Sequence, residues 1–180
     1  MKTASEELVR EHESILLSLR IIDKIVGQLK DGSEGDIEDI TSLIDFLKTF
    51  ADKCHHGKEE DLLFNALARV GFSKDNGPVG VMLTEHTMGR NFIKQMSDAI
   101  SSESFDAKAF VFGASGYTKL LRDHIDKENG VLFPMGDGQL SEATQLELIE
   151  KFRLHEENVL GGGKHQYYLD LLERLKTKYL

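Results

Sequence analysis

Four successive segments of the chain carry apolar residues at every third or fourth position, the spacing that places them on one face of an α-helix. The first segment covers about residues 4 to 30, and the second about residues 36 to 71. A third helix follows the loop at residues 76–78 and keeps its apolar face as far as Ile100. A fourth covers about residues 106 to 131. The pattern therefore predicts an all-α fold built on four long helices.

The residues that follow these segments are typical of helix ends. Asp31-Gly32 and Gly71 are helix-stop signals. Phe133-Pro134 is predicted to break the fourth helix, because proline lacks an amide proton and disfavours helical backbone in the residue before it. Since short connections join antiparallel neighbours, the predicted architecture is an antiparallel up-down four-helix bundle.

The C-terminal residues predict one or two appended helices. Gly136-Asp137-Gly138 is a predicted turn, and Ser141 is a predicted N-cap for a fifth helix. Gly161-Gly162-Gly163 interrupts that helix before a last one that ends at Leu180. The predicted fold class is therefore a four-helix bundle with a C-terminal helical extension.

Length and composition fit one compact domain. The chain has 180 residues, of which 40% are hydrophobic and 29% charged. A chain of this size can bury roughly 70% of its unfolded surface. We expect a single domain over residues 1–180, with the bundle in residues 1–135 and the extension in residues 136–180.

Charge and hydropathy narrow the range of partners. The formal net charge is −9 and the basic residues are dispersed, so nucleic acid is not an expected partner. No apolar run approaches the ~20 residues that span a bilayer, and the first residues do not form a signal peptide. We therefore expect a cytoplasmic protein with no membrane partner. Because Cys54 is the only cysteine, a bound metal would be held by histidine and carboxylate.

An internal repeat is the most specific feature of the sequence. Residues 55–64, HHGKEEDLLF, align with residues 124–133, HIDKENGVLF, and share His, Lys, Glu, Leu and Phe at the same places. Each copy is preceded by a helix with a Glu-His pair, at Glu11-His12 and at Glu85-His86. Two helical hairpins of this kind can pack about a pseudo-twofold axis, which would bring their histidines and glutamates together in the core.

The spacing within the repeat suits metal binding. In each copy a histidine and a glutamate are four residues apart, so both lie on one helix face, and the Glu-His pairs supply one further histidine from each of the other two helices. Buried carboxylates are costly without a positive partner, which a pair of cations would provide. The predicted metal ligands are His12, His55, Glu59, His86, His124 and Glu128.

The order H…HxxxE…H…HxxxE resembles the haemerythrin-like, or HHE cation-binding, family from about Glu6 to Pro134. The resemblance implies an antiparallel four-helix bundle around two non-haem iron ions, with an oxo bridge as one form of the centre. The nitrogen and oxygen donors suit iron, and manganese or zinc would also bind them. The resemblance implies that His12, His55, His86 and His124 are terminal ligands. It implies that Glu59 and Glu128 are the bridging carboxylates.

The chain departs from the haemerythrins that carry oxygen reversibly. Those proteins have a further histidine four residues after the third-helix ligand and an aspartate near the end of the fourth-helix motif, where this chain has Arg90 and Glu128. A missing nitrogen ligand would leave a further coordination position open on one iron. The resemblance therefore favours redox reaction, sensing or iron handling over reversible oxygen storage.

Other residues near the motifs have alternative interpretations. His56 and Glu60 form a second HxxxE, offset by one residue and about 100° around an α-helix from the first. We therefore expect His56 to lie outside the ligand set, with a role as an extra ligand as the less favoured alternative. We expect surface or structural roles for the two histidines of the extension, His155 and His165. We expect the glutamates of the Glu-His pairs, Glu11 and Glu85, to be exposed to solvent and not bonded to the ligands.

The first functional hypothesis is a di-iron protein that binds or reacts with O2, peroxide or NO and receives electrons from a donor that the sequence does not identify. The alternative is iron storage, delivery or sensing without turnover. A ferritin-like oxidase is disfavoured, because its Glu-x-x-His motif has the reverse order and a spacing of three. A metal-free interaction bundle is the remaining alternative, and the sequence leaves the oligomeric state open.

Overall fold

The computed structural model describes residues 2–101 and 104–180, and in these ranges the chain is helical apart from connecting turns. No strand occurs in the described residues, which confirms the predicted all-α class. The elements in chain order are α1 (Ser5–Lys30), α2 (Ile37–Phe46), η1 (Leu47–His56), η2 (Glu59–Leu63), α3 (Phe64–Arg69), α4 (Gly77–Ser101), α5 (Ala107–Lys127), η3 (Glu128–Leu132), α6 (Phe133–Asp137), α7 (Glu142–Leu160) and α8 (Lys164–Tyr179).

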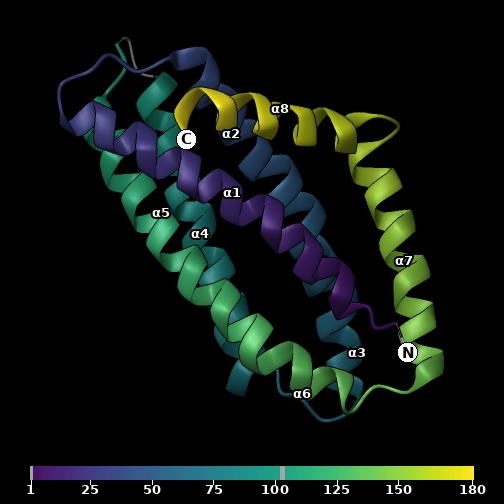
Figure 1. Ribbon diagram of the computed structural model, residues 1–180. Coiled ribbons are helices and arrows are strands. Elements are labelled where there is room, and N and C mark those ends of the chain that lie inside the picture. Colours follow the sequence, from purple (N-terminus) through teal and green to yellow (C-terminus); the bar gives the residue numbers. More distant parts are fainter. Residues whose placement is uncertain (1, 102–103) are drawn as a thin grey trace.

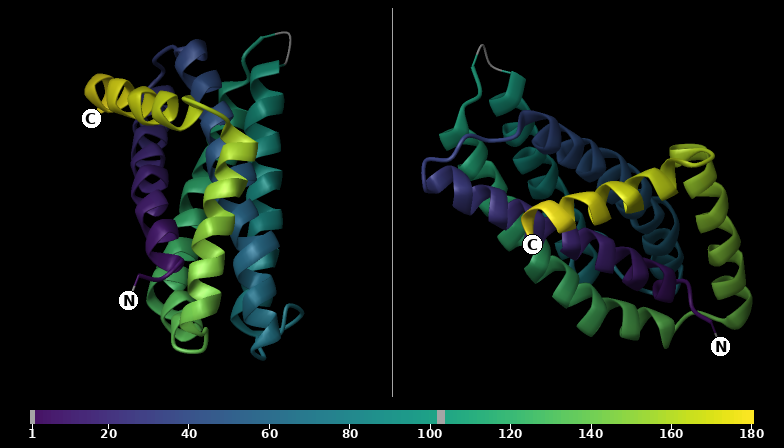
Figure 2. Two further views of the ribbon diagram at one scale, coloured as in Figure 1. Left: turned by 90° about the vertical axis from the view of Figure 1, so that its right-hand side faces the viewer. Right: turned by 45° about the horizontal axis from the view of Figure 1, so that its top comes forward.

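The long helices form a bundle with the C-terminal helices packed on its side (Figure 1). α4 packs along α5, α5 packs on α1, and both α1 and α4 contact η1. α7 contacts η1 and η2, and α8 crosses over α1 and α2 (Figure 2). The last two helices therefore cover the side of the bundle formed by α1 and the segment from α2 to η2.

Helix ends follow the signals in the sequence. Asp36, Asp106 and Ser141 are N-caps, and the side chain of each accepts a hydrogen bond from the backbone N–H three residues later. Gly32 and Gly71 follow the ends of α1 and α3 with φ of 84° and 103°. This left-handed backbone is readily adopted only by glycine, so these residues end the helices where the sequence predicts.

Three segments are wound more widely than an α-helix. η1, η2 and η3 are π-helical, with backbone hydrogen bonds that reach back five residues. In η3 the N–H of Phe133 bonds to the carbonyl of Glu128, and α6 begins directly afterwards. Pro134 therefore lies in the first turn of α6, where no amide donor is required. The predicted break at Phe133-Pro134 is wrong, since the helical path continues to Asp137.

A layer of buried polar side chains divides the apolar core into two clusters. In α1, His12 lies between Leu8 of the smaller cluster and Ile15 of the larger one. In the other long helical paths of the bundle, the buried polar residues likewise lie between residues of the two apolar clusters. The polar layer therefore extends across the whole bundle, with one apolar cluster on each side of it. Within the described ranges, no helix has an apolar stretch long enough to cross a membrane.

Candidate metal centre

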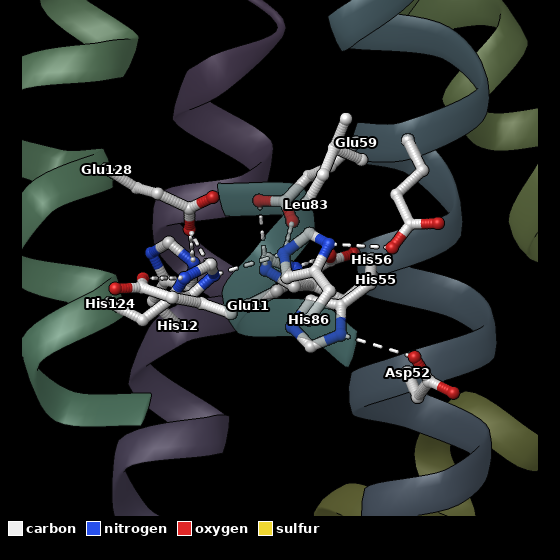
Figure 3. A network of polar contacts seen from close by, with 12 residues as sticks. Glu11, His12, Asp52, His55, His56, Glu59, Leu83, His86, His124 and Glu128 are labelled. Atoms are coloured by element: carbon white, nitrogen blue, oxygen red, sulfur yellow. Dashed lines mark hydrogen bonds and ion pairs between the residues drawn. The ribbon is translucent and has the colours of Figure 1, made fainter. Parts of the chain in front are cut away.

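Seven buried histidine and glutamate side chains converge in the polar layer (Figure 3). They form two groups that share Glu59, and in each group one ligand atom per residue lies within 4.8 Å of the others. The structure brings all six predicted ligands into these groups and adds His56. The first group is His12, His55, Glu59 and Glu128, and the second is His56, Glu59, His86 and His124.

The two glutamates lie between the groups. Each has histidines of both groups at its carboxylate oxygens, so each is placed to share charge between two cations. Figure 3 shows the carboxylates of Glu59 and Glu128 pointing into the ring of imidazoles. The distances from histidine Nε2 to the nearest carboxylate oxygen are 3.3 Å for His55–Glu59 and His86–Glu59, 3.2 Å for His12–Glu128 and 3.4 Å for His124–Glu128.

Every histidine of the two groups has an oxygen acceptor at Nδ1. A carboxylate or amide oxygen accepts from Nδ1–H, which leaves the Nε2 lone pair for a cation in the centre. These outer bonds also fix the orientation of each ring. The distances are 2.9 Å for His12–Asn129, 2.7 Å for His55–Glu11, 3.3 Å for His56–Asp52, 2.7 Å for His86–Glu60 and 2.9 Å for His124–Glu85.

Six inner atoms of the site lack hydrogen-bond partners, whereas Nε2 of His86 and Nε2 of His124 lie 3.1 Å apart, within hydrogen-bond distance of each other. Among the described residues, the buried side-chain atoms without a partner are Nε2 of two histidines, both oxygens of two glutamates and one tyrosine hydroxyl. Unpaired buried polar atoms are rare and costly, and six of these seven atoms face one another here. Bound cations would satisfy them together. The atoms belong to His12, His55, Glu59, Glu128 and Tyr117.

Electrostatics within the site favour a positive charge. Burial lowers the pKa of His55, but the Glu59 carboxylate and the hydrogen bond to Glu11 outweigh it and raise the pKa to about 10. Burial likewise lowers the pKa of His86, and its carboxylate partners raise it to about 9. Burial raises the pKa of Glu59, but the neighbouring His55 and His86 hold it well below its usual range. Without cations, protons on His55 and His86 therefore balance the charge of Glu59.

His56 faces inward, among the potential ligand atoms of the second group, and not outward as the α-helical rotation predicted. Its ring is buried and stacks on His86, and it belongs to the second group of ligand atoms. The expectation assumed the α-helical rotation of about 100° per residue. η1 is π-helical up to His56, and its wider turns rotate successive side chains by less. The second HxxxE in the sequence was the signal that could have identified this residue.

Glu11 and Glu85 are also not the solvated residues expected from the sequence. Glu11 is buried and accepts hydrogen bonds from His55 Nδ1 and from Lys58 Nζ. Glu85 accepts in the same way from His124 and from Lys127. The two copies of the repeat have a lysine at the same place, and each lysine contacts the glutamate that bonds the histidine of its copy. These matching lysines were the sequence signal that Glu11 and Glu85 take part in the site.

Arg90 stands where the oxygen carriers have a further histidine, and its side chain points to the outer partners of the second group. Its Nε lies 2.8 Å from Asp52 and its Nη2 lies 2.7 Å from Glu60. These two carboxylates are the Nδ1 acceptors of His56 and His86. Arg90 therefore neutralises the carboxylates that orient two imidazoles, and His56 supplies the additional imidazole from another helix.

The histidines of the extension do not enter either group. His155 has its Nε2 3.1 Å from the carbonyl oxygen of Lys53. His165 has its Nδ1 2.7 Å from Glu156, at the junction of α7 and α8. Both have structural contacts between the extension and its surroundings, as the sequence suggested.

An all-helical bundle whose core contains two adjoining histidine and carboxylate groups defines the class of this protein as a helical cation-binding bundle. The chain belongs to the haemerythrin HHE cation-binding domain family, whose model matches residues 3–136. It is also similar to uncharacterized proteins of Mycobacterium tuberculosis and Mycobacterium bovis, at 23% identity over 172 residues, which cover 93% of this chain and 67% of each relative. No solved structure gave a significant match.

Proposed function

We propose that the chain is a non-haem di-iron protein whose iron pair binds or reacts with a small oxidant or diatomic: O2, peroxide or NO. The observation that carries the proposal is the set of buried inner atoms without hydrogen-bond partners in the described site. Such atoms are destabilising unless cations neutralise and coordinate them. Membership of a cation-binding family supports the same conclusion.

The donor set fits two irons. Imidazole nitrogens with a few carboxylates are the ligands of many non-haem iron sites, and they also accept manganese or zinc. The outer hydrogen bonds leave an Nε2 lone pair on each histidine for the metal. One iron would be held by His12 and His55 and the other by His56, His86 and His124. Glu59 belongs to both groups, and Glu128 lies near histidines of both, so the two glutamates would be shared.

The chain's own residues prepare the site for such chemistry. Bound iron supplies electrons and a Lewis-acidic position for a small ligand. The Nδ1 acceptors hold the imidazoles in orientation, and the apolar clusters on both sides keep bulk water from the polar layer. A small diatomic or peroxide fits this setting better than a bulky substrate, because all seven ligands are buried.

We propose the antiparallel up-down arrangement of the four long helical paths, with residues 1–135 as the metal-binding bundle and residues 136–180 as its extension within one domain. We also propose a cytoplasmic protein that receives electrons from a separate donor. Its net charge of −9 supports a partner other than nucleic acid.

Iron storage, delivery or sensing without turnover is the second candidate, and one observation favours it. Glu156 of α7 contacts Lys58, Lys58 contacts Glu11, and Glu11 contacts His55. This chain of contacts joins the C-terminal extension to the metal site, so a change in metal occupancy could alter how the extension packs.

Mixing anaerobically reduced, iron-loaded protein with O2, H2O2 or NO in a stopped-flow spectrometer distinguishes the two candidates. The first predicts rapid spectral changes with at least one of these reagents, and repeated reaction when an artificial reductant is supplied. Unchanged spectra with all three would contradict it. Metal-dependent protease sensitivity in residues 140–180 would then support sensing.

A further inference from the structure

Lys58 is a buried ammonium surrounded by carboxylates. Its side chain has no exposed surface, and its Nζ lies 2.8 Å from Glu7, 2.5 Å from Glu11 and 2.8 Å from Glu156. An ammonium has three N–H donors, so each can point to one carboxylate. The burial of this charge is stable only because these partners are present together.

The same carboxylates do not form a third metal site. Glu7, Glu11 and Glu156 have oxygens within 4.8 Å of one another, a spacing that suits a cation. Lys58 already fills the centre of the group with its own positive charge. The cluster is therefore built around the lysine.

The lysine acts on the metal centre through Glu11. One oxygen of Glu11 accepts from Lys58 and the other accepts from Nδ1 of His55 at 2.7 Å. With Lys58 in place, the Glu11 carboxylate is held from both sides. The ring of His55 is thereby fixed with its Nε2 toward Glu59, 3.3 Å away.

The second copy of the repeat provides an internal comparison. Lys127 contacts Glu85, which contacts His124, but Lys127 is 42% exposed. Water screens a charge at that exposure, and surface pairs contribute little. The first copy differs because α7 of the extension covers it and supplies Glu156, which is itself held by His165 of α8 at 2.7 Å.

We propose that Lys58 is a positioning residue for the metal held by His12 and His55. Glu156 of the C-terminal extension supports Lys58, so that this metal position has a contact with the extension that the other metal position does not have. This inference rests on the proposed pair of metals. The extension thus acts on the metal position beside the first copy of the repeat and not on the one beside the second copy.

The test compares three variants: Lys58→Met, its repeat counterpart Lys127→Met, and Glu156→Gln. Metal-free protein is titrated anaerobically with Fe²⁺ against a chromophoric chelator to give two stepwise affinities. Mössbauer spectra of the ⁵⁷Fe-loaded proteins report whether the two irons are affected equally. Circular dichroism of each metal-free variant checks that it is folded.

We expect Lys58→Met to weaken one of the two binding steps by about 10-fold, the low end of the range for loss of a ligand's own outer partner, because Lys58 contacts that partner, Glu11, and not His55 itself. Lys127→Met should change either step by no more than about fivefold. Glu156→Gln should weaken the same step as Lys58→Met by a smaller factor, and should shift one of the two Mössbauer signals.

Several outcomes overturn the inference. Equal effects of Lys58→Met and Lys127→Met in folded protein would contradict the proposed difference between the two copies. If Lys58→Met does not fold, Glu156→Gln decides, and wild-type affinities in that variant would contradict the role of the extension. Failure of the wild type to bind two metals would overturn the proposed function as well, which separates that case from a failure of the positioning role alone.

Discussion

The imidazole ring of His56 stacks on that of His86, with ring centroids 3.9 Å apart and planes inclined by 18°. Two stacked rings this close are not both charged at low cost. Burial, followed by the charge of His86, lowers the pKa of His56 well below its usual range. His56 is therefore neutral over the physiological range of pH, which is the form of imidazole that binds metals. The two rings together offer neighbouring nitrogens from different helices.

Replacing His56 with isoleucine should remove one ligand from the second group, since Ile125 occupies the corresponding place in the other copy of the repeat. We expect metal at that group to bind at least about tenfold more weakly, with the first group less affected. Elemental analysis after dialysis against a weak chelator measures the loss. His155→Ile is the matched control, because His155 lies outside both groups. Full retention of two metals in His56→Ile would contradict the assignment.

The metal-free protein should lose stability as pH rises. The pKa of His55 is raised to about 10 and that of His86 to about 9, from 6.5 for an ordinary histidine. Their contribution to stability is therefore fully present below pH 6.5 and is lost as pH rises through 9 to 10. Urea unfolding of metal-free protein across this window measures the effect. An increase in stability over the same window would contradict it.

Metal affinity should follow the opposite trend with pH. Metal displaces the protons that His55 and His86 hold, so binding releases protons and becomes tighter as pH rises. Isothermal titration calorimetry in buffers of different ionisation enthalpy measures the protons released. Binding without proton release near neutral pH would show that the metal occupies some other place in the protein.

Removing the metal should destabilise the fold, because the carboxylates and imidazoles lose their shared partner. Metal at 100 times its dissociation constant stabilises the folded state by about 2.7 kcal/mol. Thermal unfolding with and without a strong chelator measures this difference. The same unfolding temperature under both conditions would indicate that no metal binds the folded chain.

Arg90→Met tests the outer support of the second group. Because Arg90 is 40% exposed, we expect a loss of stability of no more than about 1 kcal/mol. Metal affinity at the second group should nevertheless fall measurably, by up to about fivefold, since Asp52 and Glu60 lose the cation that holds them. Lys94→Met, which removes an exposed pair with Asp98, is the control. An equal effect of the two substitutions would contradict this role.

The sequence predicted the helices and most of the site because both depend on spacing. The apolar period located the helices and the glycines located their ends. The repeat and the Glu-His pairs that precede its two copies together selected six of the seven residues that meet in the core. These residues recur at fixed intervals along the chain, so their convergence follows once the helices pack about the apolar faces.

The remaining features depend on local winding and on depth of burial, which spacing alone does not reveal. His56 was assigned outward because an α-helical rotation was assumed where η1 is π-helical. The continuation of the helix through Pro134 has the same origin, in the π-helical turn of η3. Glu11 was expected in solvent because the sequence does not show that α7 covers Lys58 beside it.

The most direct test of the metal centre is the iron content of protein purified from iron-supplemented cells, measured together with X-ray absorption at the iron edge. We predict about two irons per chain in a mixed nitrogen and oxygen shell, with a second iron as a near neighbour. We also expect this iron–iron signal to disappear in Glu59→Ala. Protein that contains no stoichiometric metal, or a single metal retained by Glu59→Ala, would contradict these predictions.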